Sequence, residues 1–161
     1  MSLPRIRPAT AADVPLILAL IGELADFERL RHEVVATEAS LAAALFGERP
    51  LAEVLIAEAG PDPAGFALFF TSFSTFLGKP GIYLEDLFVR PAFRGQGVGR
   101  ALLIELAGLA TSRCCGRLEW SVLDWNSKAI GFYESLGARP QNGWTVYRLS
   151  GAALAGLGAS G

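Results

Sequence analysis

A glycine-rich segment, Arg94-Gly95-Gln96-Gly97-Val98-Gly99-Arg100, is the part of the sequence best suited to binding an anion. It follows an apolar run that ends at Val89 and precedes a helical apolar pattern over residues 102–110. Glycines let backbone N–H groups converge, and a helix N-terminus adds partial positive charge, so the segment predicts a phosphate or pyrophosphate site. An ordinary tight turn is the alternative. The flanking Arg94 and Arg100 favour the anion site, because guanidinium groups match phosphate oxygens.

The glycine-rich segment differs from the two common nucleotide-binding loops. A dinucleotide-binding fingerprint needs Gly or Ala where Arg100 stands, and a P-loop needs a Gly-Lys-Ser/Thr run that the segment lacks. The pattern that is present is Arg94-x-x-Gly97-x-Gly99. The type of phosphate ligand is therefore not decided by these two motifs.

Two adjacent carboxylates, Glu85 and Asp86, interrupt an otherwise apolar strand-like run over residues 82–89. Successive strand residues face opposite sides, so at least one carboxylate points to the face used for packing or for a ligand. A carboxylate there costs free energy unless it is paired or solvated. The pattern indicates a functional role for at least one of them, with an exposed strand edge as the alternative.

A third set of candidates lies near the C-terminus. Asn126 and Tyr133 are seven residues apart and share one face of a helix predicted over 126–136. Asn126 suits a helix cap, a ligand contact, or both, and Tyr133 suits either a core aromatic or a proton donor. Cys114 and Cys115 are adjacent and show no metal-ligand spacing, so no metal site is expected.

The elements that must position these residues follow from hydrophobic periodicity and turn signals. Helices are expected after Thr10, after Thr37, after the glycine loop, over 126–136 and in the tail over 151–157. Strands are expected over 3–6, 53–59, 65–75, 82–89, 117–123 and 144–149. Short turns join the second, third and fourth strands, which indicates an antiparallel meander within a mixed α/β layer fold.

Composition limits the class of protein. The chain has 161 residues, 52% of them hydrophobic and 19% charged, with a formal net charge of −2. We therefore expect a single domain over residues 1–161 and neither a disordered chain nor a nucleic-acid-binding one. The apolar runs are too short to span a bilayer, and no secretory signal is expected, so the prediction is a reduced, cytoplasmic protein without a membrane partner.

Taken together, Tyr83 to Val89, the glycine loop, Asp124-Trp125-Asn126 and Phe132-Tyr133 resemble the Gcn5-related N-acetyltransferase (GNAT) family. Within it the chain is similar to the spermidine/spermine (diamine) acetyltransferase group, nearer its thialysine acetyltransferase branch, and the resemblance covers nearly the whole chain. It implies a mostly antiparallel central sheet flanked by helices. The implied reaction is acetyl transfer from acetyl-CoA to the primary amine of a small molecule (thialysine-like, diamine or polyamine) by direct attack in a ternary complex.

The resemblance also implies roles for individual residues. Glu85 would accept the proton of the amine, directly or through water, and Tyr133 would be the general acid. The residues implied to bind the cofactor are Leu87, Phe88, Val89, Arg94, Gly95, Gln96, Gly97, Val98, Gly99, Arg100, Asn126, Ser127, Lys128 and Ala129. Those implied to contact the substrate are Phe27, Glu28, Glu85, Glu119, Trp120 and Ser121. The resemblance further implies a homodimer.

One position departs from the polyamine branch of this group. That branch carries an acidic residue and a tryptophan before its Gly-Lys turn, whereas this chain has Ser74 and Thr75 there. Losing the acid removes a partner for a long polycation, which favours the thialysine-like branch. Two alternatives are an acetyltransferase for a protein lysine or N-terminus and a non-catalytic acyl-CoA-binding module. The module would be expected to lack the pair of Tyr133 and Glu85.

Overall fold

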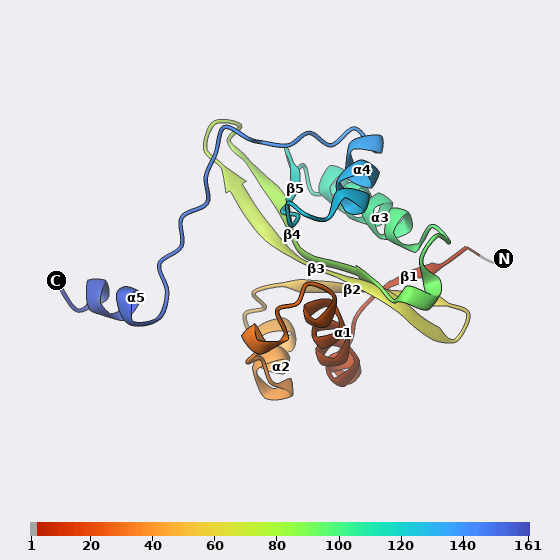
Figure 1. Ribbon diagram of the computed structural model, residues 1–161, viewed down its shortest axis with the longest axis horizontal. Helices are drawn as coiled ribbons and strands as arrows, with labels where there is room; N and C mark the ends of the chain where they lie inside the picture. Colours follow the sequence, from red (N-terminus) through yellow and green to blue (C-terminus); the bar gives the residue numbers. More distant parts are fainter. Residues whose placement is uncertain (1–2) are drawn as a thin grey trace. The chain divides into compact units, whose positions relative to one another are not determined.

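The computed structural model describes residues 3–161 and divides into two compact units, one ending at Ser121 and one spanning Val122–Gly161 (Figure 1). Each unit has its own secondary structure. The first contains the whole sheet and helices α1 to α3, and the second contains helices α4 and α5. In the part of the chain that is described, no helix combines the length and apolarity needed to cross a membrane.

The first unit is built on a five-stranded sheet in the order β1-β2-β3-β4-β5. The strands are β1 (Arg5–Pro8), β2 (Glu53–Ala59), β3 (Asp62–Ser74), β4 (Lys79–Val89) and β5 (Leu118–Trp120). The first three pairings are antiparallel, and only β4 and β5 run parallel. The expected mixed, mostly antiparallel sheet is therefore confirmed, with β2 over the predicted residues and β5 shorter than predicted.

Helices cover both faces of this sheet. Helices α1 (Val14–Phe27) and α2 (Glu38–Phe46) lie on one face, and α3 (Val98–Ser112) lies on the other (Figure 1). On the first face the core joins buried side chains of α1 to those of the strands, including Ile17, Leu20, Ile56, Phe66 and Phe88. Burial of these large apolar side chains, at about 1.5–3 kcal/mol each, fixes α1 against β4.

The predicted cap at Thr37 is confirmed as the N-cap of α2, whereas Thr10 is the N-cap of a 3-10 turn, Ala11–Asp13, that leads into α1, whose own N-cap is Asp13. Asp13 Oδ2 accepts a hydrogen bond from the Thr10 N–H at 2.7 Å, and Thr37 Oγ1 accepts one from the Ser40 N–H at 3.1 Å. Each bond satisfies an N–H group at the start of its helix. Asp13 also pairs with the Arg7 guanidinium, which lowers the pKa of that carboxyl to about 2 and ties β1 to the start of α1.

A β-bulge interrupts the register between β3 and β4. Leu68 lies opposite Asp86 and Phe69 lies opposite Leu84, so Glu85 is the extra residue on β4. Strand β5 pairs with β4 only from Ile82 to Leu84. From Glu85 to Val89, the edge of β4 that faces away from β3 has no strand beside it in the described sheet.

The second unit contains α4 (Ser127–Ser135) and α5 (Gly151–Gly158). The predicted cap at Asn126 is confirmed, because its side chain accepts a hydrogen bond from the Ala129 N–H at 3.3 Å. The predicted strand over Trp144–Leu149 is wrong, since these residues form no regular element. A strand needs a second strand to accept its hydrogen bonds, and the described residues of this unit include none.

Candidate active site

The free edge of β4 is the first component of the site. Alternate N–H and C=O groups of an antiparallel strand point away from its neighbour, so the stretch of Leu87, Phe88 and Val89 presents backbone groups at this edge. Gly65 of β3 lies opposite Val89, where any Cβ would meet the carbonyl oxygen of Phe88. These are the residues expected to hold the pantetheine arm of acetyl-CoA, and the Val89 carbonyl already accepts a hydrogen bond from Arg94 Nε.

The glycine loop is the second component, and it follows β4 after a short 3-10 turn, Pro91–Phe93. Gly95 and Gly97 have φ values of +75° and +81°, a left-handed conformation that glycine adopts readily, and Gly97 is the N-cap of α3. The Ala101 N–H donates to the Gly97 carbonyl at 2.9 Å, which starts the helical hydrogen bonding. The helix supplies no acceptor for the preceding N–H groups of Val98, Gly99 and Arg100. These N–H groups and the helix dipole fit a pyrophosphate.

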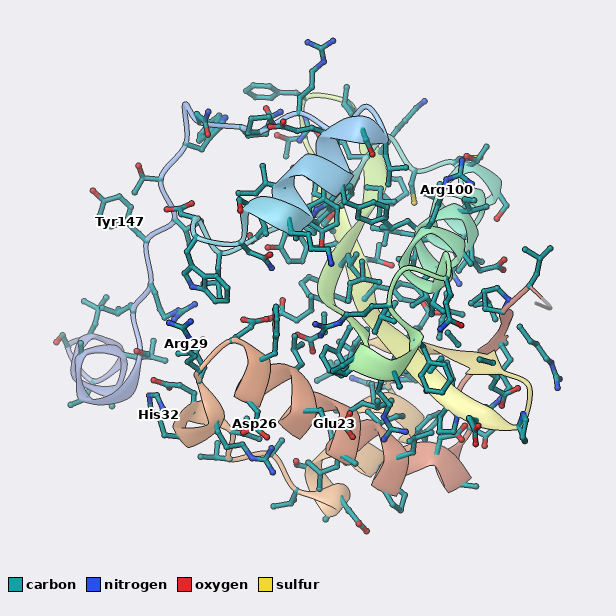
Figure 2. All side chains as sticks on the ribbon, turned by 45° about the vertical axis from the view of Figure 1, so that its right-hand side comes forward. Glu23, Asp26, Arg29, His32, Arg100 and Tyr147 are labelled. Atoms are coloured by element: carbon teal, nitrogen blue, oxygen red, sulfur yellow. The ribbon has the colours of Figure 1, made fainter. Side chains whose placement is uncertain are left out.

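The two arginines that flank the loop lie in different surroundings. Arg100 lies in the first turn of α3 (Figure 2). The Arg94 guanidinium instead lies 4.7 Å from the centroid of the Phe27 ring and 5.6 Å from that of Phe88. Its Nε also donates to the Val89 carbonyl at 2.9 Å. Arg94, expected to bind the cofactor, thus reaches from the loop to the C-terminal end of α1.

Three carboxylates form the third component. Burial is the main cause that raises the pKa of Asp86 to about 6, and the negative charges of Glu85 and Glu28 raise it further. Burial also raises the pKa of Glu28, which follows the last residue of α1, whereas Glu85 at the bulge is exposed. The expected substrate residue Glu28 and the expected base Glu85 therefore both act electrostatically on Asp86. A cationic ligand would relieve the repulsion among them.

Two features hold the end of α1 in this position. The Leu30 N–H donates to the Ala25 carbonyl at 2.8 Å, and Arg29 adopts a left-handed φ of +62° that closes the helix end. Arg90 pairs with Glu23 of α1, which is labelled in Figure 2, through two hydrogen bonds of 3.0 and 2.8 Å. Because a non-glycine residue in the left-handed region costs roughly 1–2 kcal/mol, the helix end stores strain next to the carboxylates.

The expected substrate residues on β5 lie along the same sheet edge. Trp120 is opposite Leu84, the last β4 residue before the bulge, and Glu119 is opposite Tyr83. Ser121 Oγ shares a 2.8 Å hydrogen bond with the Tyr83 hydroxyl. Glu119 also lines a cavity of about 50 Å³ together with Ser74, the residue that replaces the acid of the polyamine branch.

Comparison with known proteins decides the family. A model of the acetyltransferase (GNAT) family matches residues 21–138. The chain belongs to the GNAT acetyltransferase family. The resemblance drawn from the motifs is thereby confirmed, and this GNAT protein is an enzyme, an N-acetyltransferase that acts on amines.

Individual relatives place this GNAT enzyme near the thialysine branch. It is 38% identical to thialysine N-epsilon-acetyltransferase of Mus musculus, with 96% of each chain covered. It is also 38% identical to L-ornithine N5-acetyltransferase of Arabidopsis thaliana, over 93% of this chain and 86% of the relative. Among solved structures, an integron cassette protein of V. cholerae superposes with a TM-score of 0.82 at 27% identity, covering 99% of this chain and 100% of that one.

The remaining expected residues of the GNAT site lie in the second unit. Asn126 caps α4, and Ser127, Lys128 and Ala129 form its first turn. Tyr133 lies in the same helix, half-buried, with its ring centroid 5.6 Å from that of Phe132. Two turns of helix thus separate the expected proton donor from the cap, as their spacing in the sequence predicts.

Proposed function

We propose that this enzyme transfers the acetyl group of acetyl-CoA to the side-chain amine of a small basic amino acid of the thialysine or ornithine type. The observation that carries this proposal is that one unit contains a glycine loop at the N-terminus of α3, a strand edge without a neighbouring strand, and three carboxylates near the β4 bulge. The two curated relatives act, by their names, on thialysine and on L-ornithine, which are amino acids with a side-chain amine.

In this proposal both units form one acetyltransferase domain over residues 1–161, supported by a family match that crosses the boundary at Ser121. When bound, acetyl-CoA supplies an acetyl thioester that is activated toward amines. Leu87, Phe88 and Val89 would hold its pantetheine arm. The loop from Arg94 to Arg100 would hold its pyrophosphate, and Asn126, Ser127, Lys128 and Ala129 would complete the site.

Proton transfer is assigned to two side chains, Glu85 and Tyr133. A side-chain amine has a pKa of roughly 10.4 in water, so it arrives as a cation and must lose a proton before it can attack. Glu28 and Asp86 would hold the cation, and Glu85, exposed at the bulge, would accept the proton directly or through a water molecule. Tyr133 Oη would donate a proton to the leaving thiolate. Backbone N–H groups near Phe88 and Val89 would stabilise the oxyanion.

The substrate class is tested by a panel of amines. We would incubate the enzyme with acetyl-CoA and thialysine, ornithine, lysine, putrescine, spermidine, spermine or an unstructured lysine peptide, and follow CoA release. The kcat/KM for thialysine or ornithine is expected to exceed that for spermine by about tenfold or more, because Ser74 cannot pair with an extra cation. A preference for spermine or for the peptide would refute the proposal.

A Cys114→Ser/Cys115→Ser variant should retain turnover, since direct attack needs no thiol.

We also propose that the enzyme is a cytoplasmic homodimer. Support for the compartment comes from the two free thiols, Cys114 and Cys115. Support for the dimer comes from large exposed apolar side chains in each unit. In the first unit Phe76 is 94% exposed. In the second unit Trp144 is 82% exposed, and Tyr147, labelled in Figure 2, is 93% exposed. Light scattering on the purified protein should give about twice the chain mass of 17.1 kDa, and a monomer at micromolar concentration would contradict the dimer.

A further inference from the structure

We propose that Arg94 is a positioning residue that couples cofactor binding at the glycine loop to the amine site, acting through Phe27 and Glu28. The inference rests on the proposed function, because it assumes an anionic cofactor at the loop and a cationic amine at the carboxylates. It assigns Arg94 a task besides the phosphate contact expected of a loop arginine.

The contacts of Arg94 join three parts of the site. Its backbone directly precedes Gly95, the first glycine of the loop, so movement of the loop moves Arg94. Its guanidinium lies 4.7 Å from the centroid of Phe27 at the end of α1 and 5.6 Å from that of Phe88 on β4. Its Nε donates to the Val89 carbonyl at 2.9 Å. The side chain therefore bridges the loop, the cofactor strand and the substrate helix.

Phe27 and Phe88 differ in how firmly the core holds them. Phe88 is 4% exposed and part of the core, whereas Phe27 is 40% exposed at the end of its helix. The core therefore restrains the Phe27 ring less, and the stacked guanidinium contributes more to its position. Glu28, the next residue, acts electrostatically on Asp86. A shift of Phe27 would thus change the placement of a carboxylate in the amine site.

This arrangement gives the two ligands a physical link. An anion at the N–H groups of the loop would order residues 95–100, and Arg94 would transmit that order to Phe27 and Glu28. Coupling between two binding sites is reciprocal, so the amine would also strengthen cofactor binding. The free energy of a cation–π contact at a partly exposed site is enough to change a binding equilibrium by about three- to thirtyfold.

The first test measures whether the loop and the end of α1 communicate. Hydrogen exchange of backbone amides in residues 26–30 would be followed with and without saturating CoA, which serves as the probe. CoA is expected to slow exchange at 26–30 in the parent enzyme and to have little effect there in Arg94→Gln. Arg100→Gln is the matched control: it should weaken CoA binding but, once saturated, still slow exchange at 26–30. This readout does not depend on the acceptor amine.

The second test uses kinetics with thialysine in a double-mutant cycle. Arg94→Gln and Phe27→Leu are each expected to raise KM for thialysine about three- to thirtyfold with kcat changed less than about twofold, and the double variant should match the single ones. Arg94→Lys should resemble Arg94→Gln, because a lysine keeps the charge but loses the planar stacking group. A purely structural role would not produce this selective change in KM.

The inference would be overturned by additive effects in the cycle, by rescue in Arg94→Lys, or by equal CoA protection of residues 26–30 in Arg94→Gln. Failure of the proposed function gives a different result: the parent enzyme would bind CoA but acetylate none of the amines. In that case the exchange experiment still decides whether Arg94 links the loop to α1.

Discussion

Replacing Tyr133 with phenylalanine is expected to lower kcat by about 10²- to 10⁴-fold, the usual contribution of a positioned general acid. The variant keeps the ring that lies 5.6 Å from Phe132 and removes only the hydroxyl. Affinity for acetyl-CoA should change little, because the cofactor contacts are assigned to the loop, to β4 and to the first turn of α4. The loss should therefore appear in kcat and not in the dissociation constant of CoA.

Steady-state kinetics with thialysine, together with calorimetric titration of CoA, would measure this effect. Tyr147→Phe is the matched control, since Tyr147 is 93% exposed and also lies in the second unit. That variant should retain the parent kcat. If Tyr133→Phe kept kcat within about threefold of the parent, Tyr133 would not be the proton donor.

Asp86→Asn is expected to stabilise the fold at neutral pH. The pKa of Asp86 is raised from 3.8 to about 6 in the folded protein, chiefly by burial. Between about pH 4 and 6 the folded state holds more protons than the unfolded state, so the free energy of unfolding falls as pH rises through this range. Above pH 6 the full cost of the buried charge is present, at most about 3 kcal/mol. The neutral asparagine removes that cost.

Urea denaturation at two pH values would test this effect. The free energy of unfolding of Asp86→Asn should exceed that of the parent by up to about 3 kcal/mol at pH 8 and by close to nothing at pH 4. Glu48→Gln is the control for stability, because Glu48 is exposed and is not among the charges that raise the pKa of Asp86, so its replacement should change the free energy of unfolding little. An equal gain for Asp86→Asn at both pH values would show that burial of the charge is not its cause.

Asp86→Asn should also weaken binding of the amine substrate. Without the Asp86 carboxylate, KM for thialysine at pH 8 is expected to rise about tenfold or more, because the bound cation loses a partially buried partner. Glu85→Gln should instead lower kcat, since it removes the proposed proton acceptor. An unchanged KM in Asp86→Asn would place the amine away from this carboxylate. A rise in KM together with the gain in stability would make Asp86 an example of activity maintained at the expense of stability.

Much of the first unit could be predicted because local signals and packing agree there. The apolar run of β2, the caps at Thr10 and Thr37, and the glycine loop before α3 each combine a sequence pattern with the element that the structure contains. The strand over Trp144–Leu149 was predicted from its β-branched and aromatic residues, but strand formation depends on a partner that no local pattern reveals.

The details of the candidate site were harder to predict. Strand alternation alone cannot decide whether Glu85 or Asp86 faces the interior, because the bulge at Glu85 changes the alternation. The position of the bulge depends on how β4 pairs with β3, which the sequence of β4 alone does not contain. The sequence also offered Arg94 only as a phosphate ligand. Its contact with Phe27 joins residues 67 positions apart and arises from the packing of α1 against β4.

The short β5 leaves part of β4 as an open strand edge, and an open edge is a template on which another chain can add a strand. The ligand proposed for this stretch would need the same backbone groups that an added strand would use. Charged side chains are one way in which proteins discourage strand addition, and Glu85 and Asp86 stand at the start of the open stretch. The carboxylates assigned to the amine therefore stand where a charge would also discourage another chain from adding a strand.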